Sequence, residues 1–199
     1  PKNFKYKTIV YGLETPLYQN VKFFDDRIKN KILNSGAVGN MKPHSILIND
    51  IRNPKWNAFR VYYLRTIVNK LPYVDYTATL NHKYVNDNYP KLLGQYQTSI
   101  ASHSLYPVIK YWENTASNCL TFMEITEKNG AEILGFKNNE TAIFINEKNY
   151  KQKFEEYLAD PDNSKWEEIA NAGREYTMEN LTNDNAVESL VEIMKELIN

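Results

Sequence analysis

The sequence predicts an α/β fold, a Rossmann-like layered domain with a mostly parallel sheet flanked by helices. Short apolar runs typical of buried strands alternate along the chain with longer segments of helical periodicity. We find no series of period-2 hairpins and no internal repeat. Strands that alternate with helices favour parallel pairing, so the carboxyl ends of the strands should share one edge of the sheet.

Composition places the chain among ordinary globular domains. Its 199 residues are 42% hydrophobic and 24% charged, which suffices for one domain with a full core. The single cysteine, Cys119, excludes an internal disulfide and, with the absence of a signal peptide or bilayer-length apolar run, indicates a cytoplasmic location. We expect residues 1–28 to be a linker or the tail of a preceding domain, and residues 29–199 to be the domain itself. Because the chain opens on Pro1 rather than Met, it is expected to be a fragment.

Charge is distributed unevenly, although the net charge is zero. Residues 1–110 hold 16 Lys and Arg against 6 Asp and Glu, and residues 111–199 hold 8 against 18. A basic half indicates an anionic partner. Nucleic acid would satisfy the charge, but no basic stripe with interleaved aromatic residues accompanies it, so a nucleic-acid-binding protein is the weakest of three interpretations.

The first half contains four predicted strands and two predicted helices. Strands are expected at 8–11, 31–34, 45–49 and 73–78, and helices at 58–71 and 84–93, the second with a break at Pro90. Ser35 and Gly36 follow the second of these strands in a turn that could bring backbone N–H groups close to a phosphate. The turn does not match the dinucleotide fingerprint G-x-G-x-x-G. The stripe expected to face the core of the helix at 58–71 is Phe59, Tyr62, Tyr63, Ile67 and Leu71. Arg60 and Arg65 lie off this stripe, and the simplest alternative to a functional role is that both are solvated.

A strand at 98–102 leads directly into the most informative segment. His103 and Ser104 follow that strand, at the end where open α/β sheets bind ligands. Residues 106–116 then predict a helix that begins near Pro107 and presents Lys110 and Glu113, three apart, on one polar face. The alternative without a functional role is that Lys110 and Glu113 form a surface ion pair, which contributes a few tenths of a kcal/mol to stability.

The second half continues the alternation. Strands are expected at 120–125 and 141–145, with a loop and a short helix between them at 126–134. Asn146 is expected to cap a helix whose core face contains Phe154 and Tyr157. A capping box at 164–167 should start the next helix, Gly173 should end it, and the last helix should begin near residue 182.

Residues 106–122 resemble the donor-binding helix of GT-B glycosyltransferases, in particular the group 1 domain of the spore-maturation CgeB type. In that family a basic residue lies three before a glutamate, as Lys110 and Glu113 do, and a small-residue turn and a strand follow. Residues 134–145 resemble its return to the sheet, and 166–180 its closing helices with an A-G-R step. The resemblance extends from about Lys29 and is most specific from Tyr106 onward.

The resemblance implies a transferase that moves a sugar from a nucleotide-diphosphate donor, with no metal or other cofactor, to an acceptor held by another domain. Lys110 would meet phosphate oxygens and Glu113 ribose hydroxyls. Ser35 and Gly36 would line the diphosphate, and His103 and Ser104 would approach the sugar or the phosphates. Arg60 is the nearest match to a further basic position of the family. The catalytic base is unknown, since it would come from the other domain.

Two departures from the family pattern keep a second interpretation open. GT-B enzymes often carry another glutamate eight positions before the ribose glutamate, and Leu105 stands there in this chain. The residue after the helix is commonly glycine, and here it is Asn118, which tolerates a left-handed conformation. A non-catalytic α/β module that binds nucleotides or proteins therefore remains the alternative. The three histidines and Cys119 have no metal-ligand spacing.

Overall fold

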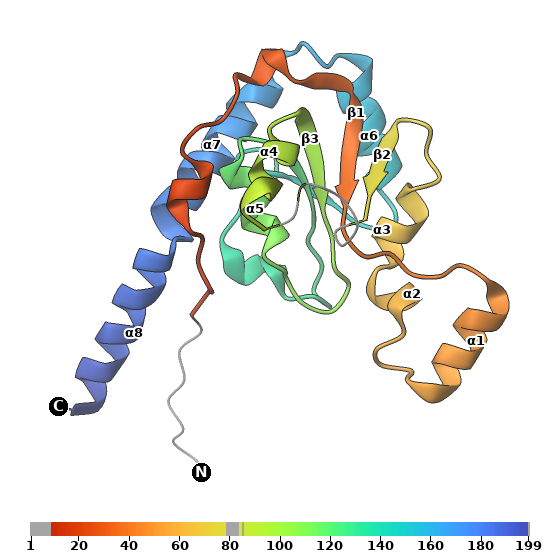
Figure 1. Ribbon diagram of the computed structural model, residues 1–199, viewed down its shortest axis with the longest axis horizontal. Helices are drawn as coiled ribbons and strands as arrows, with labels where there is room; N and C mark the ends of the chain where they lie inside the picture. The colour runs from red at the N-terminus through yellow and green to blue at the C-terminus, as the bar shows by residue number, and fades with distance from the viewer. Residues whose placement is uncertain (1–8, 79–83, 85, 199) are drawn as a thin grey trace.

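The computed structural model describes residues 9–78, 84 and 86–198, in which five strands form one sheet in the order β2-β1-β3-β4-β5 (Figure 1). All of its strand pairs are parallel, which confirms the predicted α/β fold. The strands are β1 (Ile28–Ser35), β2 (Val74–Thr77), β3 (Tyr96–Ala101), β4 (Leu120–Glu124) and β5 (Ile143–Ile145).

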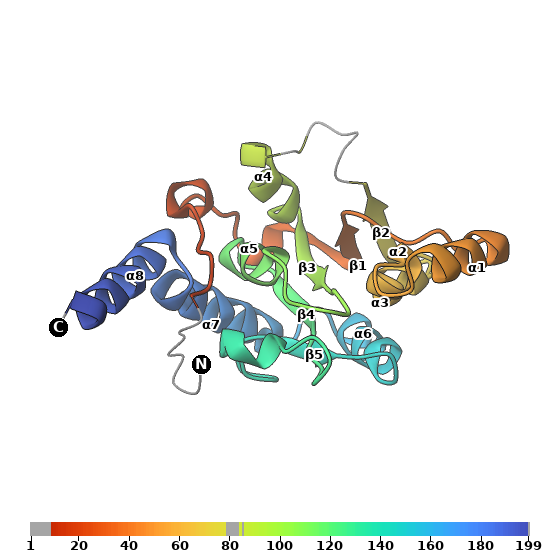
Figure 2. The ribbon, with the colours of Figure 1, turned by 90° about the horizontal axis from the view of Figure 1, so that it is seen from below.

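Helices cover both faces of this sheet (Figure 2). They are α1 (Pro43–Arg52), α2 (Ala58–Val61), α3 (Tyr63–Val68), α4 (Tyr89–Leu93), α5 (Lys110–Ala116), α6 (Tyr150–Ala159), α7 (Ser164–Asn180) and α8 (Asn183–Ile198). Four short 3-10 helices join them in the described residues: η1 (Thr15–Tyr18), η2 (Phe24–Asp26), η3 (Asn86–Asn88) and η4 (Ala131–Leu134).

Alternation along the strands divides the core into layers. In β4, Phe122 packs in one cluster with Phe154 and Tyr157 of α6, whereas Met123 packs in another with Tyr111 of α5. The same division holds in β1, where Ile32 joins the first cluster. Successive side chains of a strand point to opposite faces, so each apolar run serves both layers. The layers hold α5 against the sheet close to the carboxyl ends of β1 and β3.

The strand order reverses between β1 and β3, which are neighbours in the sheet although β2 lies between them in sequence. The chain leaves β1 at Ser35 and leaves β3 at Ala101, so both connections start at the same edge. A reversal of strand order opens a crevice outside the carboxyl ends of the strands, where ligands bind in open α/β sheets. The functional site is therefore expected between Ser35 and the start of α5.

Three predicted elements are wrong in the first half. Residues 45–49 lie in α1 rather than in a strand, because Pro43 occupies the first helical turn and starts a helix there. The helix predicted at 58–71 breaks at Tyr62 into α2 and α3, which turns a different face toward the core. Residues 9–11 form no strand, while residue 8 lies outside the described part of the chain.

Helix boundaries also differ from the predictions. Lys110 begins α5, so Pro107 precedes that helix. Residue 85 is outside the described part of the helix predicted at 84–93, but Pro90 lies in the first turn of α4 and does not interrupt it. Gly173 lies inside α7, where a Cβ atom would overlap the Thr141 carbonyl of the neighbouring chain segment. Close packing against the neighbouring segment therefore explains why a glycine stands at position 173, and termination of the helix does not.

Predictions near the ends of elements are confirmed in part. Asn118 adopts a left-handed backbone with φ of 58° after α5, as the resemblance required at this position. Phe154 and Tyr157 are buried on α6, although its N-cap is Asn149 rather than Asn146. The capping box predicted at 164–167 is wrong, because Ser164 is already the first residue of α7. Asn163 caps the helix instead, by accepting a hydrogen bond from the Lys165 backbone N–H.

The last helix, α8, extends away from the sheet at one end of the molecule (Figure 1). Its start is tied to the N-terminal segment by backbone hydrogen bonds between Leu13 and residues 181 and 183. The apolar side chains Val187, Leu190, Val191 and Met194 of α8 are exposed. Among the described residues, no helix is both long enough and apolar enough to span a bilayer.

Candidate functional site

Four elements meet where β1 ends, and each contributes one polar side chain. Ser35 ends β1, Tyr89 begins α4, Lys110 begins α5 and Arg65 comes from α3. The Ser35 hydroxyl lies 2.5 Å from the Tyr89 hydroxyl and accepts a hydrogen bond from Lys110 Nζ at 3.2 Å. The structure therefore brings two of the predicted residues, Ser35 and Lys110, into direct contact.

Lys110 is held between polar and aromatic groups. Its Nζ donates to the Tyr89 hydroxyl at 2.8 Å and lies 4.1 Å from the centre of the Tyr89 ring. Burial and the nearby Arg65 cation lower the pKa of Lys110 to about 8. No carboxylate lies within ion-pair distance of Lys110 in the described chain, so the surface ion pair with Glu113 does not form.

Arg65 is the site residue that the sequence prediction missed. It is only 3% exposed, and its Nη2 donates to the Ser35 carbonyl. Its Nε is buried without a hydrogen-bond partner among the described residues, and burial lowers the pKa of its guanidinium. A stripe at 61, 64, 65 and 68 has helical spacing and contains Arg65, so this alternative register was the signal for it.

Gly36 allows the two cations to approach the backbone. Its φ of 102° lies in the region that favours glycine, and its N–H donates to the Thr77 carbonyl at 2.9 Å. A Cβ atom at this position would overlap Arg65 Nη2 and come within 3.0 Å of Lys110 Cε. The predicted glycine turn is therefore part of the cationic site.

Substitution of Gly36 by alanine should disrupt this site. We expect strain of about 1–3 kcal/mol from the positive φ, and in addition displacement of Arg65 and Lys110. Gly130→Ala is the matched control, because Gly130 also has a positive φ (59°) but has no atom within 4 Å of the added Cβ. Chemical denaturation should show a larger loss of unfolding free energy for Gly36→Ala. Equal losses in the two variants would contradict the close approach.

Glu113 lies one helical turn after Lys110 and is half-buried. Its Oε1 accepts a hydrogen bond from the Tyr18 hydroxyl at 3.2 Å, across from the N-terminal segment. Burial raises the pKa of the Glu113 carboxyl, while the Lys110 charge opposes that rise. A half-buried carboxylate beside a cation pair presents acceptor oxygens to the hydroxyl groups of a ligand.

His103 and Ser104 lie next to this cluster but face inward. His103 Nδ1 accepts long hydrogen bonds from the backbone N–H groups of Leu105 (3.4 Å) and Tyr106 (3.3 Å). Burial and the nearby Arg65 cation lower the pKa of His103 to about 4, so its imidazole is neutral at pH 7. The Ser104 hydroxyl is buried without a hydrogen-bond partner among the described residues, and it borders a cavity of about 700 Å³.

Arg60 is not brought into the cluster. Its guanidinium forms a two-point ion pair with Asp50 on α1, with distances of 2.7 and 2.9 Å. The side chain is exposed, and its charge is neutralised by this partner. The structure thus separates the two arginines of this region: Arg60 binds a surface carboxylate, and Arg65 lies in the site.

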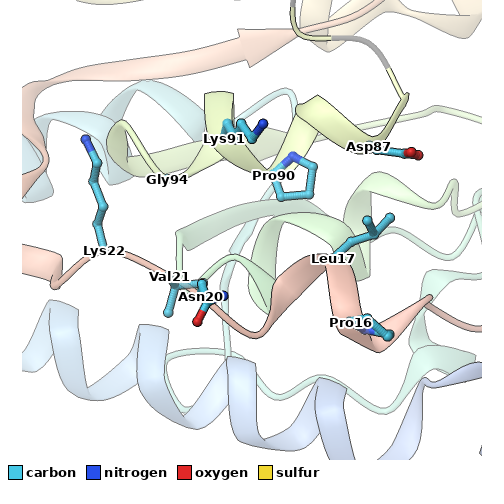
Figure 3. A pocket seen from close by; sticks show the side chains of 9 residues that line it. All are labelled: Pro16, Leu17, Asn20, Val21, Lys22, Asp87, Pro90, Lys91 and Gly94. Carbon is cyan, nitrogen blue, oxygen red and sulfur yellow. The ribbon is translucent and has the colours of Figure 1, made fainter.

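A cavity of about 360 Å³ lies beside the site between the N-terminal segment and α4 (Figure 3). Leu17 and Pro90 line opposite walls, and they adjoin Tyr18 and Tyr89 in the chain. Lys22 lies at the end away from Leu17, and Lys91 lies next to Pro90 on α4. Within the described ranges, no group of three or more His, Cys, Asp or Glu side chains is placed to hold a metal ion.

No protein-family model and no curated protein matches this chain. Solved structures do match it. A glycosyltransferase from Rickettsia africae ESF-5 aligns with a TM-score of 0.63 at 15% identity, over 94% of this chain and 56% of that one. Alr3699/HepE from Anabaena, crystallised with UDP, aligns with a TM-score of 0.63 at 9% identity, over 96% of this chain and 57% of that one.

A single domain aligns over nearly its whole length. It is the C-terminal domain of the group 1 glycosyl transferase LpcC from Francisella tularensis, with a TM-score of 0.53 at 14% identity, covering 86% of this chain and 99% of that one. The chain spans little more than half the length of the Rickettsia africae and Anabaena proteins. The narrower CgeB-type resemblance stays a prediction. The chain has the fold of the C-terminal domain of a GT-B glycosyltransferase.

Proposed function

We propose that this chain is the donor-binding domain of a glycosyltransferase, with a nucleotide-diphosphate sugar held by Arg65, Lys110 and Glu113. One observation carries the proposal: two cations, the buried Arg65 and the half-buried Lys110, lie together at the carboxyl edge of the sheet, beside Gly36. Among the described residues neither cation has a carboxylate within ion-pair distance. Buried, uncompensated charge costs free energy, and a diphosphate would offset that cost.

Each side chain suits one part of the donor. Arg65 has an Nε donor without a partner among the described residues, and Lys110 has an ammonium group beside Ser35 and Tyr89; both fit phosphate oxygens. Glu113 accepts from Tyr18 and would accept from ribose hydroxyls in the same way. The cavity between Leu17 and Pro90 leaves room for the base next to that ribose. The UDP complex of the structural neighbour HepE supports a nucleotide of this kind.

In the proposed reaction the sugar passes to an acceptor while the nucleoside diphosphate leaves. Arg65 and Lys110 stabilise the negative charge that develops on the leaving diphosphate, because they are already oriented toward it before reaction. Ser35 lines the diphosphate, and His103 and Ser104 remain proposed neighbours of the sugar. A nucleotide-sugar is thus the expected partner, rather than nucleic acid or a resident cofactor. We expect this reaction in the cytoplasm, since Cys119 is buried and unpaired.

The acceptor requires a second domain, in the same chain or in another. The boundary proposed at residue 28 would mark the junction with it. The exposed apolar residues of α8 and the incomplete coverage of the full-length neighbours support such a partner. Leu105, in place of a sugar-side glutamate, favours the alternative of a non-catalytic module.

Removal of the Glu113 carboxylate should weaken nucleotide binding through the ribose. Hydrogen bonds to charged groups contribute about 1.5–3 kcal/mol, so Glu113→Ala should lower UDP affinity by about 10- to 150-fold. Inorganic pyrophosphate, which has no ribose, should bind equally to both proteins. Calorimetry with the two ligands measures both effects. An unchanged UDP affinity would remove Glu113 from the site.

The Tyr18 hydroxyl should compete with the ribose for Glu113. Tyr18→Phe removes that competitor and leaves the ring, so we expect UDP affinity to rise by about 2- to 10-fold, which corresponds to one net hydrogen bond. The same calorimetric titration provides the measurement. A fall in affinity would show that Tyr18 itself contacts the nucleotide.

A further inference from the structure

Aromatic side chains connect the cationic site with the surface. Arg65 lies 5.4 Å from the Tyr62 ring, and that ring packs edge-on against His103 at 5.4 Å. His103 lies 4.1 Å from the Tyr106 ring, which in turn lies 6.3 Å from Trp56. The rings thus run from the proposed phosphate position to an exposed tryptophan.

Trp56 borders a cavity of about 460 Å³, a volume within the range of small-molecule sites. Its side chain is 57% exposed, whereas the chain's other tryptophans, Trp112 and Trp166, are buried. Tyr106 beside it is 45% exposed. Two exposed aromatic rings beside an open cavity contribute little to packing of the core. Their exposure indicates a binding site.

Leu105 lines this cavity together with Val61. The loop that carries Leu105 is fixed to α2, because the Ser104 backbone N–H donates to the Val61 carbonyl at 3.0 Å. Leu105 replaces the glutamate expected on the sugar side of the donor. An acceptor of sugar hydroxyls is thereby exchanged for an apolar side chain in the cavity that Trp56 also lines.

The charge around the cavity is positive. Lys55 and Lys128 line it, and neither has an ion-pair partner within the part of the chain that the structure describes. Arg60 also lines it, but Asp50 neutralises that guanidinium. Two lysine ammonium groups therefore line this cavity, although Lys128 also borders the neighbouring cavity that Glu124, Glu127, Glu132 and Glu147 line. Their charge favours an anionic substituent on the ligand.

We propose that this cavity binds a sugar ring that carries a carboxylate, with the ring stacked on Trp56 and the carboxylate between Lys55 and Lys128. The C–H groups on one face of a pyranose are slightly positive and suit the negative face of an indole. The inference rests on the proposed function and names its substrate class, an acidic sugar. The ring could belong to the donor or to the acceptor saccharide.

Tryptophan fluorescence tests this inference directly, because Trp56 is the exposed tryptophan. We expect methyl glucuronide to produce a saturable change and to bind about tenfold more tightly than neutral methyl glucoside, since only the acid forms charge-assisted bonds. Trp56→Ala should abolish binding of methyl glucuronide in a calorimetric titration, which does not depend on the removed fluorophore. A joint Lys55→Gln and Lys128→Gln variant should bind the acid and the neutral sugar equally. Tyr11→Ala, which removes an exposed aromatic ring beside α8, is the matched control and should bind normally.

UDP-glucuronic acid then identifies the source of the ring. If it binds more tightly than UDP and Trp56→Ala removes the gain, the ring belongs to the donor. If methyl glucuronide binds but UDP-glucuronic acid shows no gain, the ring belongs to the acceptor. Absence of a saturable response, or unchanged calorimetric binding of methyl glucuronide by Trp56→Ala, overturns the inference. UDP binding by the same proteins separates this outcome from failure of the proposed function, because Trp56 should not affect UDP.

Discussion

Substitution of Arg65 by methionine should remove most of the affinity for UDP and stabilise the free protein. The guanidinium is buried, has an unpartnered Nε and lies near the Lys110 cation. Loss of its charged hydrogen bonds should lower UDP affinity by about 100-fold. Methionine has a similar length but no charge, so the folded variant does not bury a cation. The unfolding free energy should therefore rise by about 1 kcal/mol.

Arg60→Met is the matched control for this prediction. It removes an arginine from the preceding helix, but one that is exposed and paired with Asp50. Its UDP affinity should remain close to that of the parent protein. Calorimetry and chemical denaturation on both variants give the two quantities. A large loss of stability in Arg65→Met with unchanged UDP affinity would identify Arg65 as a structural residue.

The affinity for UDP should fall as the pH rises through about 8. Lys110 has its pKa lowered to about 8 by burial and by Arg65, so in the free protein it loses its charge above that value. A diphosphate binds the charged form, and the affinity should fall by up to about tenfold for each pH unit above 8. Lys110→Arg should bind UDP without this dependence, because arginine stays protonated. A wild-type affinity that is flat to pH 9 would contradict a diphosphate contact.

Stability of the free protein should change in the opposite direction. The ordinary pKa of lysine is 10.5, so between about pH 8 and 10.5 the unfolded chain holds a proton that folded Lys110 has lost. Unfolding then takes up a proton, and the contribution of Lys110 to stability rises with pH in this range. Below pH 8 the penalty for burying the charge is fully present. Denaturation of Lys110→Met, compared with the parent protein at several pH values, isolates this contribution.

The sheet could be predicted from sequence because its strands are short, apolar and separated by helices. The strand predicted at 45–49 was wrong because a short apolar segment fits a strand and a helix equally well. Pro43, in the first helical turn, favours the helix that forms there. Lys110 and Glu113 were found because both lie on one helix, where spacing determines the face. Arg65 was missed because the break at Tyr62 changed the register of the helical face. The contact between Tyr18 and Glu113 joins residues 95 apart, which no local pattern reveals.

Calorimetric titration with UDP, GDP, ADP and CMP, without added metal, tests the nucleotide site most directly. We predict saturable binding of one nucleoside diphosphate at a single site, and loss of that binding in a combined Arg65→Met and Lys110→Met variant that remains folded. CMP, which has one phosphate, should bind more weakly than the preferred diphosphate. Failure of all four nucleotides to bind, or equal binding by the double variant, would contradict a donor site at the carboxyl ends of β1 and β3.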